Sequence, residues 1–310
     1  MATVTSRWDT STYRRDILKD GAIRVLFNNS LKDTPVLYKE LVKEEKVKDW
    51  IDFERSWTGL GLASEIVEGQ NIPLDSPIFG NQKIYTQRIW GSGFRMTKVM
   101  NRFNKHQLFE KLAKNLGKVM RETKDVEVHV MFNNLTSTTL TCSTGFDSMA
   151  IANNAHTGLA SGTADNYDNY LAAALSLSGL ESARYYFATL LDDRGLHRGG
   201  KATHLVFNPA LWPTVNEILK SNLKPFETSN TTNIHKGSLT PYEDFRLSST
   251  TTWFVIDKDS DIYDFKVKTA QEPELVTKDA PDSTGDRLCL ADQYFTYGWG
   301  DPRCLYAGRT

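Results

Sequence analysis

The stretch from Gly195 to Ala202 comes closest to a nucleotide-binding motif in this chain. It reads Gly-Leu-His-Arg-Gly-Gly-Lys-Ala and resembles a phosphate-binding loop, in which backbone N–H groups and a lysine hold phosphate oxygens. Such a loop follows a strand, precedes a helix, and carries a Ser or Thr after the lysine to hold magnesium. Here the pattern predicts a helix before the stretch and a strand after it, and Ala202 has no hydroxyl. We therefore interpret it as a glycine-rich turn.

The remaining residues capable of chemistry are scattered in the sequence. No histidine begins an HExxH motif, no two histidines stand four residues apart, and none lies near a cysteine, so the pattern predicts no metal site. Gly158–Gly162 has the wrong spacing for a nucleophile elbow. The carboxylate pair Asp192–Asp193 falls in a turn, where capping explains it. The sequence therefore predicts no catalytic residue, no metal and no cofactor.

Composition describes a folded, mixed-class protein. The 310 residues are 40% hydrophobic and 24% charged, which suffices for a core and is too balanced for a disordered chain. A net charge of −1 gives no global attraction to nucleic acid. No apolar run approaches the roughly 18 residues of a membrane span, and the first residues lack a secretory signal. We expect a soluble protein that is made in the cytoplasm, without disulfide bonds.

Charge is unevenly distributed along the chain. The segment from Lys83 to Lys124 contains eleven basic residues and only two acidic ones, whereas residues 125–183 contain no Lys or Arg. The segment from Asp257 to Asp292 contains ten acidic residues and five basic ones. These segments are either solvated faces or complementary surfaces that meet between copies of the chain. A basic face turned toward DNA is a third interpretation.

The first hundred residues predict extended, outward-reaching structure. Residues 1–57 have short helical periodicity, little continuous apolar surface and many aromatic residues, which is typical of an arm that docks on the body or on a neighbour. Residues 58–100 predict a long β-hairpin, with one strand at 64–72 and the returning strand at 82–90. Gly91 and Gly93 are expected to break that strand where the hairpin rejoins the body.

A long helix is the strongest periodic signal, over residues 104–133. Its apolar residues recur at spacings of three and four and predict the buried stripe Leu108, Leu112, Leu116, Val119, Thr123, Val126 and Val130. Thirty residues make a rod of roughly 45 Å. Gly117 costs such a helix about 1 kcal/mol relative to alanine.

The second half of the chain predicts a compact α/β part followed by returning strands. A helix is expected near 168–191, with an apolar face of Leu171, Leu175, Leu180, Tyr186 and Leu190. A strand at 203–207, a helix at 211–220 that begins with proline, and a polar loop at 222–241 follow. Three strands, at 252–256, 265–268 and 287–297, complete the prediction.

This order of elements resembles the major capsid protein of tailed bacteriophages, whose Hong Kong phage-type fold is shared with encapsulin compartments. Several stretches are similar to that family: Thr58–Ala63, Glu68–Ser76 and Tyr85–Thr97 to its extended loop, Leu116–Leu135 to its spine helix, Leu205–Trp212, Ile218–Ser221 and Asn230–Asn233 to its axial domain, and Trp253–Ile256 with Gly298–Arg303 to its closing strands. The resemblance covers roughly residues 20–308.

The resemblance implies an α+β fold in four parts. These are an N-terminal arm (1–57), an extended β-hairpin loop (58–100), a peripheral domain with the spine helix (101–164 and 251–310) and an axial domain (165–250). It also implies a structural role without enzymatic activity. Many copies would assemble as pentamers and hexamers into an icosahedral shell around viral double-stranded DNA, in the host cytoplasm and then in the virion capsid.

The implied partners are other copies of the chain, a portal protein, a scaffold protein and decoration proteins, with non-specific contact to packaged DNA and no membrane. No long scaffolding segment precedes the arm, so we expect a separate scaffold protein or none. We expect no Lys–Asn cross-link. The alternatives are an encapsulin-like compartment that holds an enzyme cargo and, in a different class, a soluble α/β ligand-binding protein or hydrolase.

A helix, a hairpin and an arm of this kind would leave apolar surface that a monomer rarely exposes. The residues that we expect to contact neighbouring copies are Trp50 and Trp57 on the arm, Arg88, Trp90 and Arg95 on or beside the hairpin, and Lys114, Lys118 and Arg121 on the spine helix. For each tryptophan the competing interpretation is core packing, and for each lysine it is a solvated face.

Overall fold

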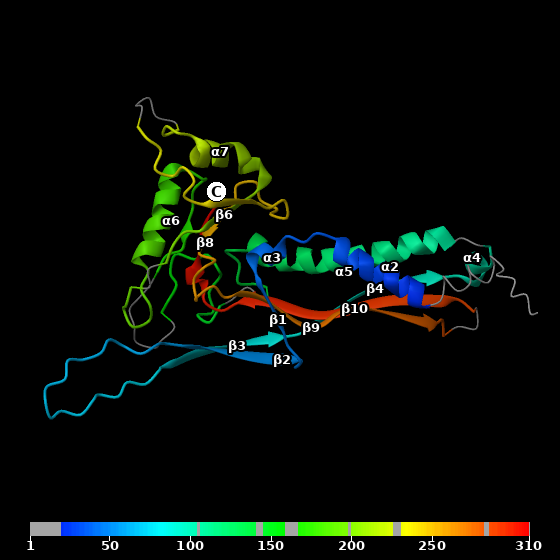
Figure 1. Ribbon diagram of the computed structural model, residues 1–310, viewed down its shortest axis with the longest axis horizontal. Helices are drawn as coiled ribbons and strands as arrows, with labels where there is room; N and C mark the ends of the chain where they lie inside the picture. Colours follow the sequence, from blue (N-terminus) through cyan, green and yellow to red (C-terminus); the bar gives the residue numbers. More distant parts are fainter. Residues whose placement is uncertain are drawn as a thin grey trace, which may run out of the picture.

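A long four-stranded sheet forms the base of the molecule (Figure 1). The computed structural model describes residues 20–103, 106–140, 145–158, 167–197, 200–225, 231–281 and 285–309. The sheet has the order β1-β9-β10-β4, in which β1 runs parallel to β9 and the other pairs are antiparallel. Its strands are β1 (Lys43–Lys46), β4 (Arg88–Met96), β9 (Phe265–Asp279) and β10 (Arg287–Trp299). Alternate residues of β10 turn one apolar face toward the covering helices.

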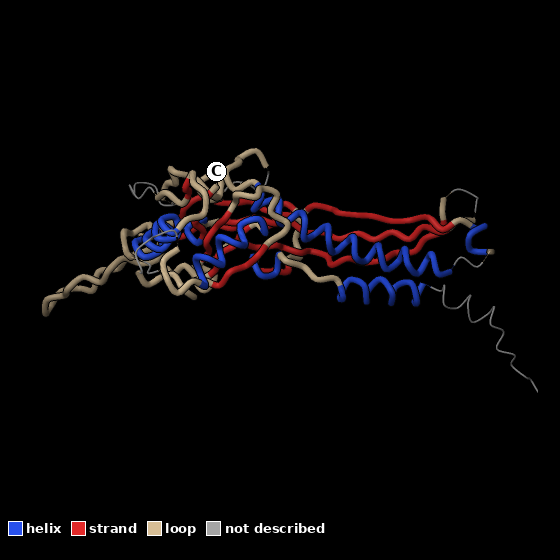
Figure 2. Tube along the Cα trace, turned by 90° about the horizontal axis from the view of Figure 1, so that it is seen from above, coloured by secondary structure: helices blue, strands red, loops and turns tan. Residues whose placement is uncertain are grey.

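Helix α5 (His106–Asn133) lies along this sheet and confirms the predicted long helix (Figures 1 and 2). Its 28 residues span roughly 42 Å. Of the predicted stripe, Leu116 is buried and Leu112, Thr123 and Val130 are half-buried. The prediction was wrong at Leu108, Val119 and Val126, which are exposed. The apolar side chains of α5 that are buried are Phe109, Ala113, Leu116, Met120, Val128, Met131 and Phe132. The prediction failed because α5 is covered on two sides, by the sheet and by a second helix.

That second helix is α2 (Asp20–Asp33), from the segment predicted as an arm. Its Ile23 and Phe27 are buried with Phe109 and Leu116 of α5 and with residues of β10. The helices approach closely at Gly117, where an added Cβ would lie 2.7 Å from the Phe27 carbonyl oxygen. The glycine that weakens α5 as an isolated helix therefore permits α2 to dock. Residues 1–19 of the predicted arm lie outside the described residues.

A five-stranded sheet and two helices form a second layered unit (Figure 1). The strand order is β5-β11-β8-β6-β7, with α6 (Leu177–Thr189) and α7 (Trp212–Lys220) against one face and the end of α5 against the other. The strands are β5 (Tyr170–Leu171), β6 (His204–Phe207), β7 (Thr240–Glu243), β8 (Trp253–Ile256) and β11 (Leu305–Gly308). Short helices complete the described chain: α3 (Tyr38–Leu41), α4 (Lys98–Arg102), η1 (Pro209–Leu211) and η2 (Pro302–Cys304).

Several sequence predictions for this half need correction. The helix expected at 168–191 begins only at Leu177, because residues 170–171 pair with β11. The strand expected at 265–268 extends to Asp279, and the predicted loop 222–241 ends in β7. The strand predicted at 252–256 is confirmed as β8, which pairs with β6 and β11 in the five-stranded sheet. Among the described helices, none combines the length and apolar character that crossing a membrane requires.

A row of polar residues at four-residue spacing on α5 connects three parts of the molecule. These are the first layered unit, formed by the four-stranded sheet with α2 and α5, the second layered unit, and the N-terminal segment at residues 34–38. Arg121 donates to the Thr34 carbonyl oxygen (2.8 Å), and Asn133 donates to that of Arg246 (3.0 Å). Asp125 lies between them and accepts hydrogen bonds from the backbone N–H groups of residues 37 and 38 and, at 3.1 Å, from the Arg246 side chain. Spacing of four places all these groups on one face.

His129 occupies the centre of this row and is buried. Its Nε2 lies 3.1 Å from the Asp244 carboxylate, which is also buried, and its Nδ1 lies 2.5 Å from the Asp125 carbonyl oxygen. Burial alone would lower the pKa of His129, but the adjacent Asp244 and Asp125 outweigh burial and raise it. When the imidazole is protonated, it therefore stabilises the contact between α5 and the segment after β7.

Replacement of Gly117 tests the approach of α2. We expect Gly117→Ala to lower the free energy of unfolding by about 1–3 kcal/mol, because the added methyl group displaces the α2 backbone and outweighs its helix propensity. Asn115→Ala, at an exposed position of the same helix, is the control and should be neutral or slightly stabilising. Urea denaturation of both variants measures the difference, and a stabilised Gly117→Ala would contradict the packing described.

The raised pKa of His129 makes stability depend on pH. Below about pH 6.5, the usual value for histidine, its contribution is complete, and it is lost as pH rises through the folded-state pKa. We expect the free energy of unfolding to fall over that range in the native chain and to stay flat in His129→Gln, as measured by urea denaturation at several pH values. His204→Gln is the control, because burial and then Lys258 lower the pKa of His204 and confine its effect to lower pH. Equal slopes in all three proteins would refute the assignment.

Candidate assembly surface

Two strands and the loop between them project from the base of the molecule (Figures 1 and 2). Strand β2 (Ile51–Trp57) pairs antiparallel with β3 (Phe79–Thr86), and we call this pair the ribbon. Residues 58–78, the projecting loop, contain no strand. The predicted pairing of 64–72 with 82–90 was therefore wrong. Its first strand lies earlier, at 51–57, where apolar and polar residues alternate, and the returning segment is divided between β3 and β4.

Strand β4 continues through the two glycines that were expected to break it. It pairs residue by residue with β10, and Gly93 lies opposite Leu290. A Cβ on Gly93 would lie 2.6 Å from the Leu290 side chain, so the glycine provides space within the sheet rather than a bend.

One face of the ribbon is apolar and faces solvent. The register places Phe53 opposite Ile84 and Trp57 opposite Phe79, and Trp57 is 65% exposed. The Arg55 guanidinium lies 5.5 Å from the centre of the Phe79 ring on the same face. Aromatic residues and arginine are the types most enriched where proteins meet.

The opposite face of the ribbon is charged and faces the sheet. Lys268 of β9 is only 2% exposed, and its ammonium contacts Glu54 at 2.6 Å and also Asp52, beneath the Tyr85 ring. Lys266 contacts Glu54 at 2.8 Å. Burial opposes ionisation of Glu54, but the two lysines outweigh burial and lower its pKa. Ion pairs therefore hold the ribbon and leave its apolar face outward, the reverse of an ordinary sheet packed on a core.

The projecting loop exposes further apolar side chains. Leu74 is 95% exposed, and the other exposed members are Leu60, Leu62, Ile66, Val67, Ile72 and Ile78. Contiguous apolar surface of this kind marks an interaction site on a folded protein. The ribbon and the projecting loop together form the strongest candidate site in the described part of the chain.

Arg194 clamps the base of the projecting loop to the turn after α6. Its guanidinium donates to the Ser76 carbonyl oxygen at 2.9 Å and lies 3.4 Å from the Asp75 carboxylate. Asp75 also accepts a hydrogen bond from the Gly61 backbone at 2.7 Å, and this bond is the largest cause of its lowered pKa. The two ends of the loop are thus joined to each other and to the second layered unit.

The three tryptophans that were predicted to contact neighbouring copies lie in different environments. Trp57 belongs to the outward face of the ribbon, and Trp50 is half-exposed with its ring edge toward Tyr294 at 6.5 Å. Trp90 is half-buried and stacks on Phe295 at 5.7 Å, so core packing describes its observed contact.

The basic residues that were predicted to contact neighbouring copies fall into two groups, exposed residues and residues with partners in their own chain. Lys114 and Lys118 are exposed on α5, and Arg88 is half-buried on β4. Arg95 and Arg121 have partners within the chain, respectively the Asp286 carboxylate and the Thr34 carbonyl oxygen, both at 2.8 Å. Of all the predicted contact residues, the structure brings only Trp57 into the ribbon. Phe53, Phe79 and Ile84 were missed, although the alternation of residues 51–57 was a signal for Phe53.

The predicted opposition of basic and acidic segments is partly satisfied inside one subunit. Arg95 from the basic stretch pairs with Asp286 from the acidic stretch, and Lys124 pairs with Glu44 and donates to Thr269 at 2.8 Å. These pairs join α5 and β4 to the strands beside them. Charge complementarity between copies therefore depends on the remaining exposed lysines.

The residues singled out for chemistry have structural roles. The Lys201 backbone N–H, which in a phosphate loop would face the ligand, donates to the Asp257 carboxylate at 2.8 Å. A carboxylate there repels phosphate. Within the described ranges, no three His, Cys, Asp or Glu side chains gather where they could hold a metal ion.

Comparison with known proteins gives one consistent result. The family model described as phage capsid protein matches residues 80–308. No curated protein matches the sequence. Among solved structures, the chain is similar to the capsid of cyanophage P-SCSP1u (TM-score 0.58, 9% identity, covering 89% of this chain and 88% of that one). It is also similar to the Pyrococcus furiosus virus-like particle (TM-score 0.53, 8% identity, covering 93% of this chain and 98% of that one). A third similar structure is that of Gordonia phage Cozz (TM-score 0.52, 15% identity, covering 87% of this chain and 85% of that one). At these identities the structural likeness shows the fold alone.

Loss of Lys268 should release the ribbon. We expect Lys268→Met to lower the free energy of unfolding by about 1–3 kcal/mol, because the half-buried carboxylates of Glu54 and Asp52 lose the ammonium group beneath them. Arg55→Met, on the outward face, is the control and should change stability by no more than about 0.5 kcal/mol. Urea denaturation at subunit concentrations below assembly measures both, and equal stabilities would show that the ion pairs do not hold the ribbon.

Proposed function

Because the chain belongs to the phage capsid protein family, we propose that it assembles through rings of five and six copies into an icosahedral shell around double-stranded viral DNA. It is a structural protein of the virion capsid and not an enzyme. Its mixed α+β fold is of the Hong Kong phage type, as the resemblance implied. The DNA content and the ring sizes belong to the proposal.

The outward apolar face of the ribbon is the single observation that carries the assembly proposal. Phe53, Trp57, Phe79 and Ile84 share one exposed face, and the projecting loop extends it. Exposure of this apolar face to water is unfavourable. The ion pairs between Glu54 and the lysines of β9 keep the ribbon from turning this face toward its own subunit. A neighbouring copy of the chain supplies the cover, and in a closed shell each copy both gives and receives this contact.

The proposed roles of the parts of the chain follow the four segments that the resemblance implied. Residues 1–57 act as an arm, 58–100 as the extended loop, 101–164 and 251–310 as the peripheral domain, and 165–250 as the axial domain at the ring centre. The exposed position of Trp57 supports a contact between copies for that residue, and the exposure of Lys114 and Lys118 permits one. For Arg88, Trp90, Arg95, Trp50 and Arg121 such a contact is a proposal beside the contacts made within the subunit.

The proposed partners are a portal protein, a scaffold protein and decoration proteins, with non-specific contact to packaged DNA. The second candidate is a compartment that holds an enzyme cargo. The fold likeness to the Pyrococcus furiosus virus-like particle supports a shell without distinguishing the contents, whereas the phage capsid family favours DNA. Nuclease-protected DNA in purified particles would support the first candidate, and a co-purified enzyme would support the second.

Polar replacement of the outward aromatic residues tests the proposal. We expect the double variant Phe53→Ser and Trp57→Ser to fold normally, because both side chains face solvent, and to form at least about tenfold fewer shells, because apolar contact is lost. Electron microscopy and sedimentation count the shells, and circular dichroism checks the fold.

The matched control is Trp212→Ser with Phe245→Ser, two exposed aromatic residues outside the ribbon. Its folded subunits should keep the ribbon contact and still form capsomers or shells. Normal shell numbers from the ribbon variant would remove the ribbon from the assembly surface.

A further inference from the structure

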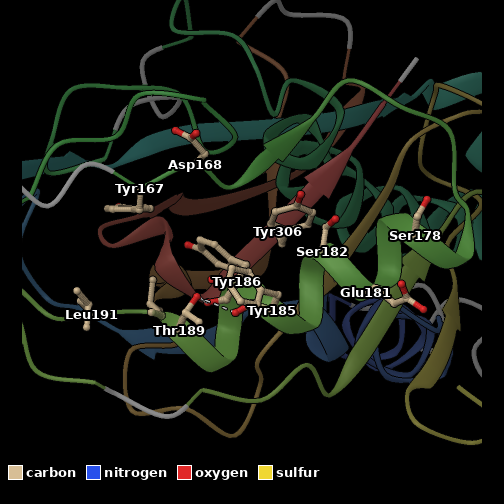
Figure 3. Close-up of a pocket in the computed structure, with 11 residues that line it drawn as sticks. Tyr167, Asp168, Ser178, Glu181, Ser182, Tyr185, Tyr186, Thr189, Leu191 and Tyr306 are labelled. Atoms are coloured by element: carbon tan, nitrogen blue, oxygen red, sulfur yellow. Dashed lines mark hydrogen bonds between the residues drawn. The ribbon is translucent and has the colours of Figure 1, made fainter. Parts of the chain in front are cut away.

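An open cleft lies along α6, away from the ribbon (Figure 3). Its volume is about 710 Å³. Residues of α6 form one wall, and Tyr167, Asp168 and Tyr306 complete the cleft from the segment before β5 and from β11. The cleft thus opens at the β5 edge of the five-stranded sheet, and β7 is the opposite edge. No part of the ribbon or the projecting loop lines it.

Four tyrosines give the cleft its chemical character. Tyr167 is held by stacking on His156 at 4.8 Å, and Tyr186 is held beside Tyr306 at 5.3 Å. Tyr186 also donates to the Arg303 carbonyl oxygen at 3.4 Å. Tyr185, in contrast, is 72% exposed. Three rings are therefore fixed in the wall, and the fourth stands open at the surface.

The charged groups of the cleft carry one sign. Asp168 and Glu181 line it, and no Lys or Arg is among the lining residues of the described chain. Asp168 lies near enough to Tyr306 to add to burial in raising the pKa of that hydroxyl. The Arg303 guanidinium lies 5.2 Å from the centre of the Tyr167 ring, but it is buried and paired with Asp193. Carboxylates beside aromatic faces attract ammonium and guanidinium groups and repel phosphate.

Resting on the proposed function, we propose that this cleft receives an arginine or lysine side chain from the neighbouring copy in the same ring. In a closed ring of identical copies the interfaces are heterologous, so each copy uses two different surfaces for its two neighbours. The β5 edge of one copy therefore meets a surface of the next copy other than that copy's own β5 edge. Among the described residues, no Lys or Arg of the same copy lines the cleft, although Arg184 is exposed on α6 beside the lining residue Tyr185. The chain is nevertheless close to neutral overall, so compensating cations lie elsewhere on every copy.

The exposure of Tyr185 supports the same occupant. A large aromatic side chain at the mouth of a cleft is a typical anchor of a contact between proteins, and it shields a charge pair behind it from water. An arginine in this position can stack on the ring and reach a carboxylate with the same group. The contact would tie ring neighbours together independently of the ribbon.

A photoreactive residue at position 185 tests the identity of the occupant. We replace Tyr185 with p-benzoylphenylalanine, irradiate assembled shells and unassembled subunits, and map the cross-linked peptides by mass spectrometry. The expected result is a cross-link between two copies, in shells or capsomers only, to a peptide whose nearest residues include Lys or Arg. Cross-links only within one chain, or none in shells, would overturn the inference.

Charge removal tests the contribution of the carboxylates. We expect Asp168→Asn with Glu181→Gln to form shells that dissociate about tenfold faster in urea than native shells, with a weaker dependence on salt. Asp168→Glu should restore most of the native rate. Because Glu181 also lies 3.4 Å from His235, thermal unfolding of the subunits checks that the fold is unchanged.

Glu217→Gln, an exposed carboxylate on α7 outside the cleft, is the matched control and should leave the dissociation rate unchanged. If the cleft variants dissociate at the native rate, the cleft holds no cation and the inference fails, while shell formation itself leaves the proposed function intact. A native chain that never forms rings or shells would overturn both.

Discussion

Burial of charge beneath the ribbon is the constraint on which the rest of this structure depends. Lys268 projects from β9 into a position that water hardly reaches, so its charge requires the anions that Glu54 and Asp52 supply from β2, and Lys266 shares Glu54 with Asp264. Because side chains alternate along a strand, that requirement turns Phe53 and Trp57 to the other side. One electrostatic need inside the subunit thus creates the apolar surface outside it.

Helix α5 applies the same principle in the body of the molecule. Its apolar residues meet α2 and the long sheet, while its polar row contacts the N-terminal segment and the segment after β7. The polar contacts are directional and distinguish one arrangement of these parts from others, whereas the apolar contacts supply most of the attraction. The helix therefore defines how the two layered units sit relative to each other.

Sequence patterns predicted the existence and type of the longest elements, such as α5 and β10. They failed at the α5 stripe because Lys124, Asp125 and His129 are buried, and a periodic pattern assigns polar residues to the surface. They failed at β2 for the opposite reason, since its aromatic residues face water. Both failures occur where one part of the chain contacts another or is left open for a partner, which local sequence does not encode.

The length of α5 has a mechanical consequence. A rod of roughly 42 Å acts as a lever, so a tilt of about 5° at one end displaces the other by about 4 Å. The polar row fastens the N-terminal segment and the second layered unit to the same end of this lever. Flat and curved regions of a closed surface could then be accommodated by small rotations of intact parts, without repacking either core.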